Sequence, residues 1–320
     1  MREIGGYIEF EYYAGNMLYE NLLHFDCGRS CLEYLITVND IKKIYIPLFL
    51  CDSIKERCDR CGVSVEYYEI DRYFHILDEK KIKKDEWIYL VNYYGQLSND
   101  YMNCIYAKYQ NLIIDNVHAY FTPPMKGIDT LYSCRKFLGV ADGGILYARK
   151  RDVIFEEEIK TDKSFDRMHF LLGRFEGLAS DYYEEYKENN DDFSFREMKW
   201  MSHLTENLLR GIDYQRVRKI RDENFKLLDD FLSDINELNV TNVPGPYAYP
   251  FLHKNGSKMR KELINKKIYI PQLWPEVLDY CKDNSVEKYY AENILPLPCD
   301  QRYSASDMEY IAKELMEMMG

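Results

Sequence analysis

The chain has 320 residues, enough for two domains or for one large domain with an appendage. Its 42 Lys and Arg against 54 Asp and Glu give a net charge of −12, and an acidic chain without a basic stripe binds nucleic acids and anionic membranes poorly. Hydrophobic residues make up 46% and aromatic residues 15%, which excludes a disordered protein and predicts a sizeable core.

The ends and the cysteines indicate a compartment. The N-terminal residues lack the basic and apolar regions of a secretory signal, and the longest apolar run, at 44–51, is too short to span a membrane. Nine scattered cysteines do not resemble a disulfide framework. Cys58 and Cys61 form one C-x-x-C without a second pair, which favours a helix turn over a zinc site. We therefore expect a cytoplasmic protein without a bound metal.

Strand-like and helical segments alternate over the first 150 residues. Helical patterns occupy 31–38 and 51–61, and short β-rich segments occupy 43–47, 63–70, 87–92, 112–115 and 144–147. This alternation predicts an α/β fold with a mostly parallel sheet flanked by helices. Ligands of such sheets bind beyond the carboxyl ends of the strands, so the residues that follow each strand are the candidates for chemistry.

The second half of the chain has a different pattern. Residues 151–204 are charged and aromatic without a clear strand, and the acidic run at 181–192 indicates a solvated helix end or loop. Apolar residues recur at helical spacing over 203–232, as one helix or as two with a break near Gly211. Farther on, 239–243, 247–253 and 267–271 have strand patterns, and 256–265 and 304–319 have helical ones. We predict a large domain over 1–234 and a small α+β domain over 235–320.

The first candidate site residues open the first predicted helix and end a predicted strand. Gly28, Arg29 and Ser30 begin the helix, where small residues bring unpaired N–H groups up to an anion. Asp115 ends the strand at 112–115, and His118 follows three residues later. Taken alone, Gly28, Arg29 and Ser30 are explained better by an ordinary helix start than by a phosphate cup. A capping role explains Asp115 as well as a ligand contact does.

The third candidate is Lys136, which is flanked by apolar and small residues shortly before Gly143 and Gly144. Desolvation of a lysine favours loss of its proton and formation of a Schiff base, although a surface lysine is an equal alternative. A phosphate cup, an acid at a strand end and a lysine, in this order, are what pyridoxal 5′-phosphate (PLP) requires in enzymes of fold type I.

Residues 112–147, LIIDNVHAYFTPPMKGIDTLYSCRKFLGVADGGILY, resemble the DegT/DnrJ/StrS family of sugar aminotransferases, which has PLP fold type I. The similarity extends over nearly the whole chain, including IYIPLFLCDSI, VNYYGQ and FSFRE. It implies that Asp115 binds the pyridine nitrogen, that Lys136 forms the Schiff base, that Ser133 holds the phosphate and that His118 lines the cofactor pocket.

The same resemblance places FSFRE where the family has Asn-x-Arg, a segment that reaches the active site of the partner subunit. Ser194 and Arg196 would make this contact, and the resemblance therefore implies a homodimer. Cys51 occupies the position of the aromatic residue that stacks on the cofactor. Phe49 and Tyr94 are alternatives for stacking, and Asn92 is a further candidate for the pocket.

Two further positions depart from the family pattern. Ser133 precedes Lys136 by three residues instead of five, and Arg29 stands where a threonine is usual. A branch of the family with histidine in place of the lysine dehydrates sugars, and Lys136 argues against that branch.

The resemblance implies an aminotransferase that takes an amino group from an amino acid, in the first place glutamate. The cofactor is left as pyridoxamine phosphate (PMP) and then aminates a keto sugar linked to a nucleotide. The departures leave two alternatives open. One is a protein of PLP fold that binds a ligand or partner without catalysis, and the other is a different PLP reaction, such as decarboxylation of an amino acid.

Overall fold

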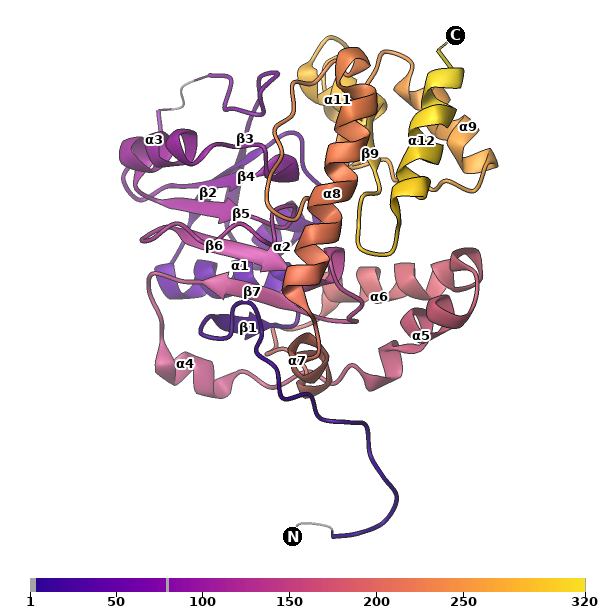
Figure 1. Cartoon of the computed structure of the whole chain (residues 1–320). Coiled ribbons are helices and arrows are strands. Elements are labelled where there is room, and N and C mark those ends of the chain that lie inside the picture. Colours follow the sequence, from indigo (N-terminus) through magenta and orange to yellow (C-terminus); the bar gives the residue numbers. More distant parts are fainter. Residues whose placement is uncertain (1–3, 79–80, 320) are drawn as a thin grey trace.

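A computed structural model describes residues 4–78 and 81–319 and shows a large sheet flanked by helices, with a smaller unit beside it (Figure 1). Within these residues, seven strands form the large sheet in the order β1-β7-β6-β5-β4-β2-β3. They are β1 (Leu23–Phe25), β2 (Lys43–Pro47), β3 (Ser64–Tyr68), β4 (Trp87–Val91), β5 (Leu112–Asp115), β6 (Asp129–Ser133) and β7 (Gly144–Tyr147).

The strands from β3 to β6 in this order run parallel, whereas β7 is antiparallel to both β6 and β1. β4 and β5 are buried along their whole length, which explains their nearly continuous apolar sequences WIYLV and LIID. The prediction of an α/β fold with a mostly parallel sheet is confirmed. Because parallel strands end at the same edge, Asp115 lies at the edge where ligands of such sheets bind.

Helices cover the sheet and fill the second half of the chain. In the described residues they are α1 (Gly28–Asn39), α2 (Asp52–Arg60), α3 (Asn99–Tyr109), α4 (Val153–Glu158), α5 (His169–Glu176), α6 (Tyr183–Phe195), α7 (His203–Arg210), α8 (Tyr214–Leu232), α9 (Gly256–Asn265), α10 (Val277–Tyr280), α11 (Val286–Asn293) and α12 (Ala305–Glu317). α1 packs on β6 and β7, α2 on β3 and α3 on β5. The predicted break near Gly211 separates α7 from α8.

The smaller unit contains the antiparallel pair β8 (Tyr249–Leu252) and β9 (Ile294–Leu297). Two predictions in this part were wrong, because 239–243 and 267–271 form no strands. Lys267 has a left-handed φ of 60° that ends α9 in a turn, and Ile270 is buried without a strand partner. The backbone N–H of Thr241 donates to Gln96 Oε1 at 2.7 Å instead of to a strand.

The helix α8 joins the two units, as its position between them shows (Figure 1). Its first turns pack with the large sheet through Val217, whereas Phe225, Leu228 and Leu232 belong to a second core with β8, β9, α9 and α12. The second core therefore takes in the last turns of α8. The boundary at residue 234 stays a prediction.

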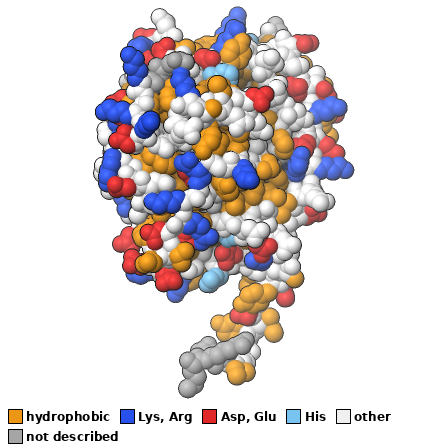
Figure 2. Space-filling model, turned by 90° about the vertical axis from the view of Figure 1, so that its left-hand side faces the viewer, with side chains coloured by type: hydrophobic (Ala, Val, Ile, Leu, Met, Phe, Trp, Pro, Cys, Tyr) orange, Lys and Arg blue, Asp and Glu red, His pale blue; other side chains and the backbone are white. Residues whose placement is uncertain are grey.

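The N-terminal segment runs away from the body of the molecule (Figure 1) and has hydrophobic side chains along its length (Figure 2). Ile4, Tyr7 and Ile8 are each more than 90% exposed. Only its end is fixed to the body, where the Tyr13 N–H donates to Asn207 Oδ1 at 2.9 Å. In residues 4–78 and 81–319, no helix has the length and apolar character needed to cross a membrane.

Candidate functional site

The start of α1 lies against the start of β7. A Cβ atom at Gly144 would lie 2.4 Å from the carbonyl carbon of Cys27, so only glycine permits this approach. Gly28 follows directly, and Ser30 is buried with its Oγ 3.4 Å from Cys27 Sγ. β7 therefore fixes the position of the predicted phosphate cup.

The N-terminus of α1 is electrically positive, and no acidic side chain lies in its first turn. Its N-cap residue, Cys27, makes no side-chain cap hydrogen bond, and the first turn contains no acidic residue. The first N–H groups of a helix have no partner within the helix and favour negative charge. Arg29, in this turn, adds a guanidinium whose Nη1 donates to the carbonyl oxygen of Asn190 at 3.0 Å.

Asp115 ends β5 as a buried carboxylate. Oδ2 accepts a hydrogen bond from the Tyr89 hydroxyl at 2.7 Å, and Oδ1 accepts one from the Val117 N–H at 2.9 Å. Burial raises the pKa of Asp115, and the two hydrogen bonds oppose that shift only in part. A cationic group placed against this carboxylate would stabilise its ionised form.

Lys136 lies next to His118, with 3.1 Å between Lys136 Nζ and His118 Nε2. The residue is exposed in the single chain, yet desolvation by the surrounding protein lowers the pKa of its ammonium. Burial also lowers the pKa of His118 well below its usual value, so the imidazole is neutral. Within the described part of the chain, the buried Nδ1 of His118 has no hydrogen-bond partner.

The charges that act on Lys136 show which of the predicted site residues lie near it. Cys51 and Asp115 raise the pKa of Lys136 and Arg29 lowers it, each less strongly than desolvation. Arg29, Cys51, Asp115, His118 and Lys136 therefore lie near one another, and a common cofactor site remains a prediction. Their individual roles remain predictions.

Several aromatic rings pack around His118. Tyr247 stacks on the imidazole at a centroid distance of 4.3 Å and an interplanar angle of 3°, and Trp274 is parallel to it at 5.9 Å. Both rings come from the C-terminal part of the chain. Tyr247 was not predicted from the sequence, because no local motif marks a ring that reaches the site from a distant segment.

Other predicted pocket residues face the core. Phe49 is buried against Tyr93 and Trp274, and Tyr94 is fully buried with its ring tilted over His118. Asn92 uses its side chain to bond Asn116 and the Leu97 N–H, each at 3.0 Å. Burial raises the pKa of the Cys51 thiol, and the nearby charges of Lys136 and Arg29 oppose that shift.

Ser133 lies at the end of β6 and is buried. Its hydroxyl makes no hydrogen bond to any residue in 4–78 or 81–319. A free hydroxyl suits a ligand contact, and the assignment of Ser133 to the phosphate stays a prediction.

The segment at 181–192, expected as a solvated helix end or loop, forms most of α6. The carbonyl groups at the end of this helix accept hydrogen bonds from two arginines of α2. Arg57 donates to Phe193 at 2.7 Å, and Arg60 donates to Ser194. Cations favour a helix C-terminus, so α2 holds α6 beside α1.

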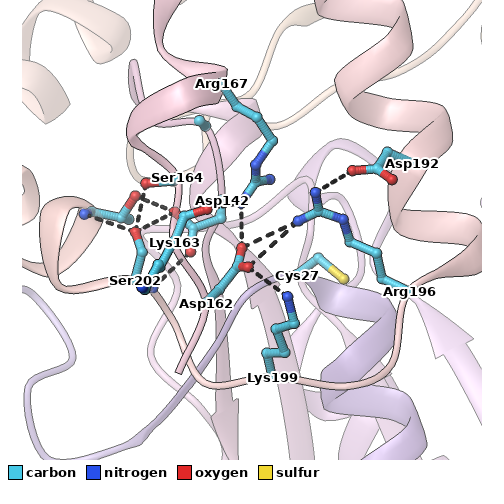
Figure 3. Close-up of polar contacts among 12 residues, drawn as sticks. Cys27, Asp142, Asp162, Lys163, Ser164, Arg167, Asp192, Arg196, Lys199 and Ser202 are labelled. Atoms are coloured by element: carbon cyan, nitrogen blue, oxygen red, sulfur yellow. Dashed lines mark hydrogen bonds and ion pairs between the residues drawn. The ribbon is translucent and has the colours of Figure 1, made fainter. Parts of the chain in front are cut away.

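Arg196 pairs with acids of its own chain, at 3.5 Å from Asp162 and also with Asp192 (Figure 3). Asp162 in addition binds Arg167 and, at 3.0 Å, Lys199. The contact of Ser194 and Arg196 with a partner subunit remains a prediction, since the structure holds one chain.

Asp26 immediately precedes Cys27 in the chain and is a buried acid with a pKa near neutral pH. Neither of its carboxylate oxygens has a hydrogen-bond partner among residues 4–78 and 81–319. Burial, with a smaller contribution from the charges of Asp162 and Asp142, raises the pKa of Asp26 to about 7. Asp142 is held by the N–H and the hydroxyl of Ser202, each at 2.8 Å (Figure 3).

Three solved structures illustrate the similarity of the whole chain to known proteins. The sugar aminotransferase CalS13 from Micromonospora echinospora has a TM-score of 0.62 at 12% identity, covering 92% of this chain and 87% of that chain. A DegT DnrJ EryC1 StrS aminotransferase from Brucella abortus has a TM-score of 0.62 at 14% identity, covering 97% and 92%. The Escherichia coli GDP-4-keto-6-deoxy-D-mannose-3-dehydratase with bound hydrated PLP has 0.63 at 16%, covering 92% and 87%.

No protein-family model and no curated protein matches the sequence. The chain therefore has the fold of these three proteins, and the predicted fold class is confirmed. Because the similar structures include both aminotransferases and a dehydratase, the fold by itself does not select the reaction.

Proposed function

We propose that this chain is a PLP-dependent aminotransferase that moves an amino group from an amino acid, in the first place glutamate, to a keto sugar linked to a nucleotide. The observation that carries the proposal is the position of Lys136. Its Nζ lies 3.1 Å from the neutral His118 and in the field of Asp115, and it has no acidic ion-pair partner among the residues described.

The residues present fit a phosphorylated pyridine aldehyde at both of its ends. The α1 N-terminus and Arg29, which has no acidic ion-pair partner among the described residues, offer positive charge for a phosphate. Asp115 offers a buried carboxylate for a protonated ring nitrogen, and its raised pKa marks the cost of leaving it without a cation. His118 Nδ1 and the Ser133 hydroxyl remain free to bind polar atoms of a ligand.

When bound, PLP supplies an aldehyde that condenses with amines and a ring that withdraws electrons. The lowered pKa of Lys136 increases the fraction of unprotonated Nζ near neutral pH, which can take a proton from a carbon atom and return it. His118 stays neutral, so its Nε2 can hydrogen-bond Nζ and orient it.

Support for the sugar acceptor comes from the similar structures, since CalS13 is named a sugar aminotransferase and the E. coli enzyme is named for a GDP-linked keto sugar. Lys136, in place of the histidine of the dehydratase branch, favours amination over dehydration. Glutamate and the nucleotide link rest on the family resemblance.

We also propose a homodimer, because large apolar side chains lie exposed on the segment from α4 to α6, here called the α4–α6 surface. Its members are Val153, Ile154, Phe165, Leu172, Phe175, Leu178 and Phe195. Phe175 is 91% exposed. Exposed large apolar side chains are typical of protein interfaces, and a second copy of the chain is the partner we propose.

The test is covalent labelling. We expect that purified protein incubated with PLP and then reduced with borohydride carries one cofactor mass on the peptide that contains Lys136. Lys136→Ala should lose the label, whereas Lys219→Ala, which changes an exposed lysine of α8, should keep it. Glutamate added to the unreduced protein should give one equivalent of 2-oxoglutarate per site.

The outcomes separate the alternatives. No bound cofactor, or label on another lysine, would overturn the proposal. A label on Lys136 without a reaction with any amino acid would favour the non-catalytic alternative. That alternative is supported by Cys51, which stands where the family resemblance implies a stacking aromatic residue. Release of carbon dioxide from an amino acid would favour decarboxylation.

A further inference from the structure

Six guanidinium groups lie around the C-terminal half of α6, and they differ in whether an acid pairs with them. Arg57, Arg167 and Arg196 pair with the acids Glu33, Asp162 and Asp192. In contrast, neither Arg29 nor Arg135 forms an ion pair with any acid of residues 4–78 and 81–319. Arg60 has no acidic partner within the described residues either, but it is exposed and donates to the Ser194 carbonyl at the end of α6. Arg29 and Arg135 are the arginines without an acid that lie near Lys136.

Asn190 brings these two arginines together. Its backbone carbonyl accepts Arg29 Nη1 at 3.0 Å, and its side-chain Oδ1 accepts a hydrogen bond from Arg135 Nη2. The Arg135 guanidinium also lies over the ring of Phe193, with 4.4 Å to the centroid. These contacts fix both guanidiniums and leave the remaining N–H groups available, because each guanidinium has five donors.

The surroundings of the pair also favour an anion. Arg29 belongs to the first turn of α1, whose N–H groups have no acidic side chain near them in that turn. Arg135 precedes Lys136, and the charges of both arginines lower the pKa of Lys136, after the larger effect of desolvation. Burial is likewise the main cause that lowers the pKa of Arg135, with Arg29 adding to it. Two cations held together without an acid are unfavourable until an anion joins them.

We propose that Arg29 and Arg135, positioned by Asn190 of α6, form a two-guanidinium site for the dianion of a phosphate monoester. The ligand that we assign is the phosphate group of PLP, and this assignment rests on the proposed function. Two planar guanidinium groups, each with paired N–H donors, match the three oxygen atoms of a phosphate better than the two oxygen atoms of a carboxylate. The family pattern uses hydroxyl groups for its phosphate contacts, and the shortened spacing between Ser133 and Lys136 alters these contacts. The two arginines would supply contacts in their place.

The experiment compares PLP with pyridoxal, which has the same ring and aldehyde without the phosphate. We expect Arg135→Gln to raise the Kd for PLP by about 10- to 100-fold, the range for loss of charge-assisted hydrogen bonds, and to change the Kd for pyridoxal by less than about 3-fold. Arg135→Lys should lose part of the effect, because it keeps the charge without the fork. Arg218→Gln, at an exposed position of α8, is the control and should bind as the parent protein does.

A second measurement does not depend on the cofactor. Inorganic phosphate, at ionic strength matched with chloride, should raise the thermal midpoint of the parent protein but not of a variant with both Arg29→Gln and Arg135→Gln. Equal weakening of PLP and pyridoxal by Arg135→Gln, or no weakening of either, would overturn the site. If the parent protein binds neither compound but is stabilised by phosphate through the two arginines, the proposed function fails while the anion site remains.

Discussion

Asp26, which lies just before α1, has unusual surroundings for a carboxylic acid. It is completely buried, both of its oxygens lack partners in the described chain, and its pKa rises to about 7. The folded state therefore holds a proton on Asp26 that the unfolded chain, with a pKa near 3.8, releases at lower pH. The free energy of unfolding is predicted to fall as pH rises from about 4 to 7 because of this residue.

Asp26→Asn keeps the shape of the side chain and removes the titration. We expect the difference in unfolding free energy between variant and parent to shift in favour of the variant by about 1–3 kcal/mol from pH 5 to pH 8. Urea unfolding at the two pH values measures it. The control is Asp307→Asn at the start of α12, because the backbone N–H of Ser304 lowers the pKa of Asp307. Its effect should be equal at both pH values, and an equal effect for Asp26→Asn would contradict the prediction.

At the scale of single residues, the sequence predicted the central groups of the site and missed those that support them. Asp115, His118 and Lys136 lie within one stretch whose spacing is visible in the chain. Arg135 is next to Lys136, but its role depends on Asn190, 55 residues away, and no local pattern indicates that contact. Whether an arginine pairs with an acid depends on the tertiary structure, which a local sequence pattern does not contain.

At the scale of elements, the contact of β7 with the start of α1 is the tightest constraint on the site. A Cβ at Gly144 would lie 2.4 Å from the carbonyl carbon of Cys27 and 2.9 Å from the nitrogen of Gly28, and both are backbone atoms. Backbone cannot move aside as the end of a flexible side chain can. The N-terminus of α1 therefore depends on the absence of a side chain in β7.

Gly144→Ala tests this dependence. We expect a loss of about 2–4 kcal/mol in unfolding free energy, because overpacking against backbone forces β7 and α1 apart. Stabilisation by inorganic phosphate should fall as well. Gly139→Ala is the matched control, since a Cβ there would meet no atom within 4 Å, and it should change stability by less than about 0.5 kcal/mol. Equal unfolding curves for the two variants would show that the contact is looser than described.

Sequence patterns predicted some elements with the bounds that the structure has and missed others. β2, β5 and β7 have the predicted bounds, as does α9. β1 has only three residues, and β9 follows α11 without a loop and contains Pro296, which weakens a strand pattern. β6 was not predicted because its sequence DTLYS is mostly polar or aromatic, although the strand is buried.

At the scale of the whole molecule, the α4–α6 surface and the N-terminal segment expose apolar side chains in spite of a net charge of −12. A double change of Phe175→Glu and Leu178→Glu adds charge to that surface. We expect the parent protein to sediment as a dimer and the double variant as a monomer, because burying unpaired carboxylates in an interface is unfavourable. Leu77→Glu, at a half-exposed position elsewhere, is the control and should leave the dimer intact. A monomeric parent protein would contradict the proposed homodimer.

The pairing of β1 with β7 also has a consequence for the order in which the molecule is made. Translation delivers β1 and the start of α1 first, but their partner Gly144 comes much later, and Asn190 later still. Until α6 has left the ribosome, the nascent chain has an unpaired strand edge and two arginines without their common anchor. Such long-range pairing is slow and exposes strand edges to aggregation, so we expect early truncated chains to depend on chaperones.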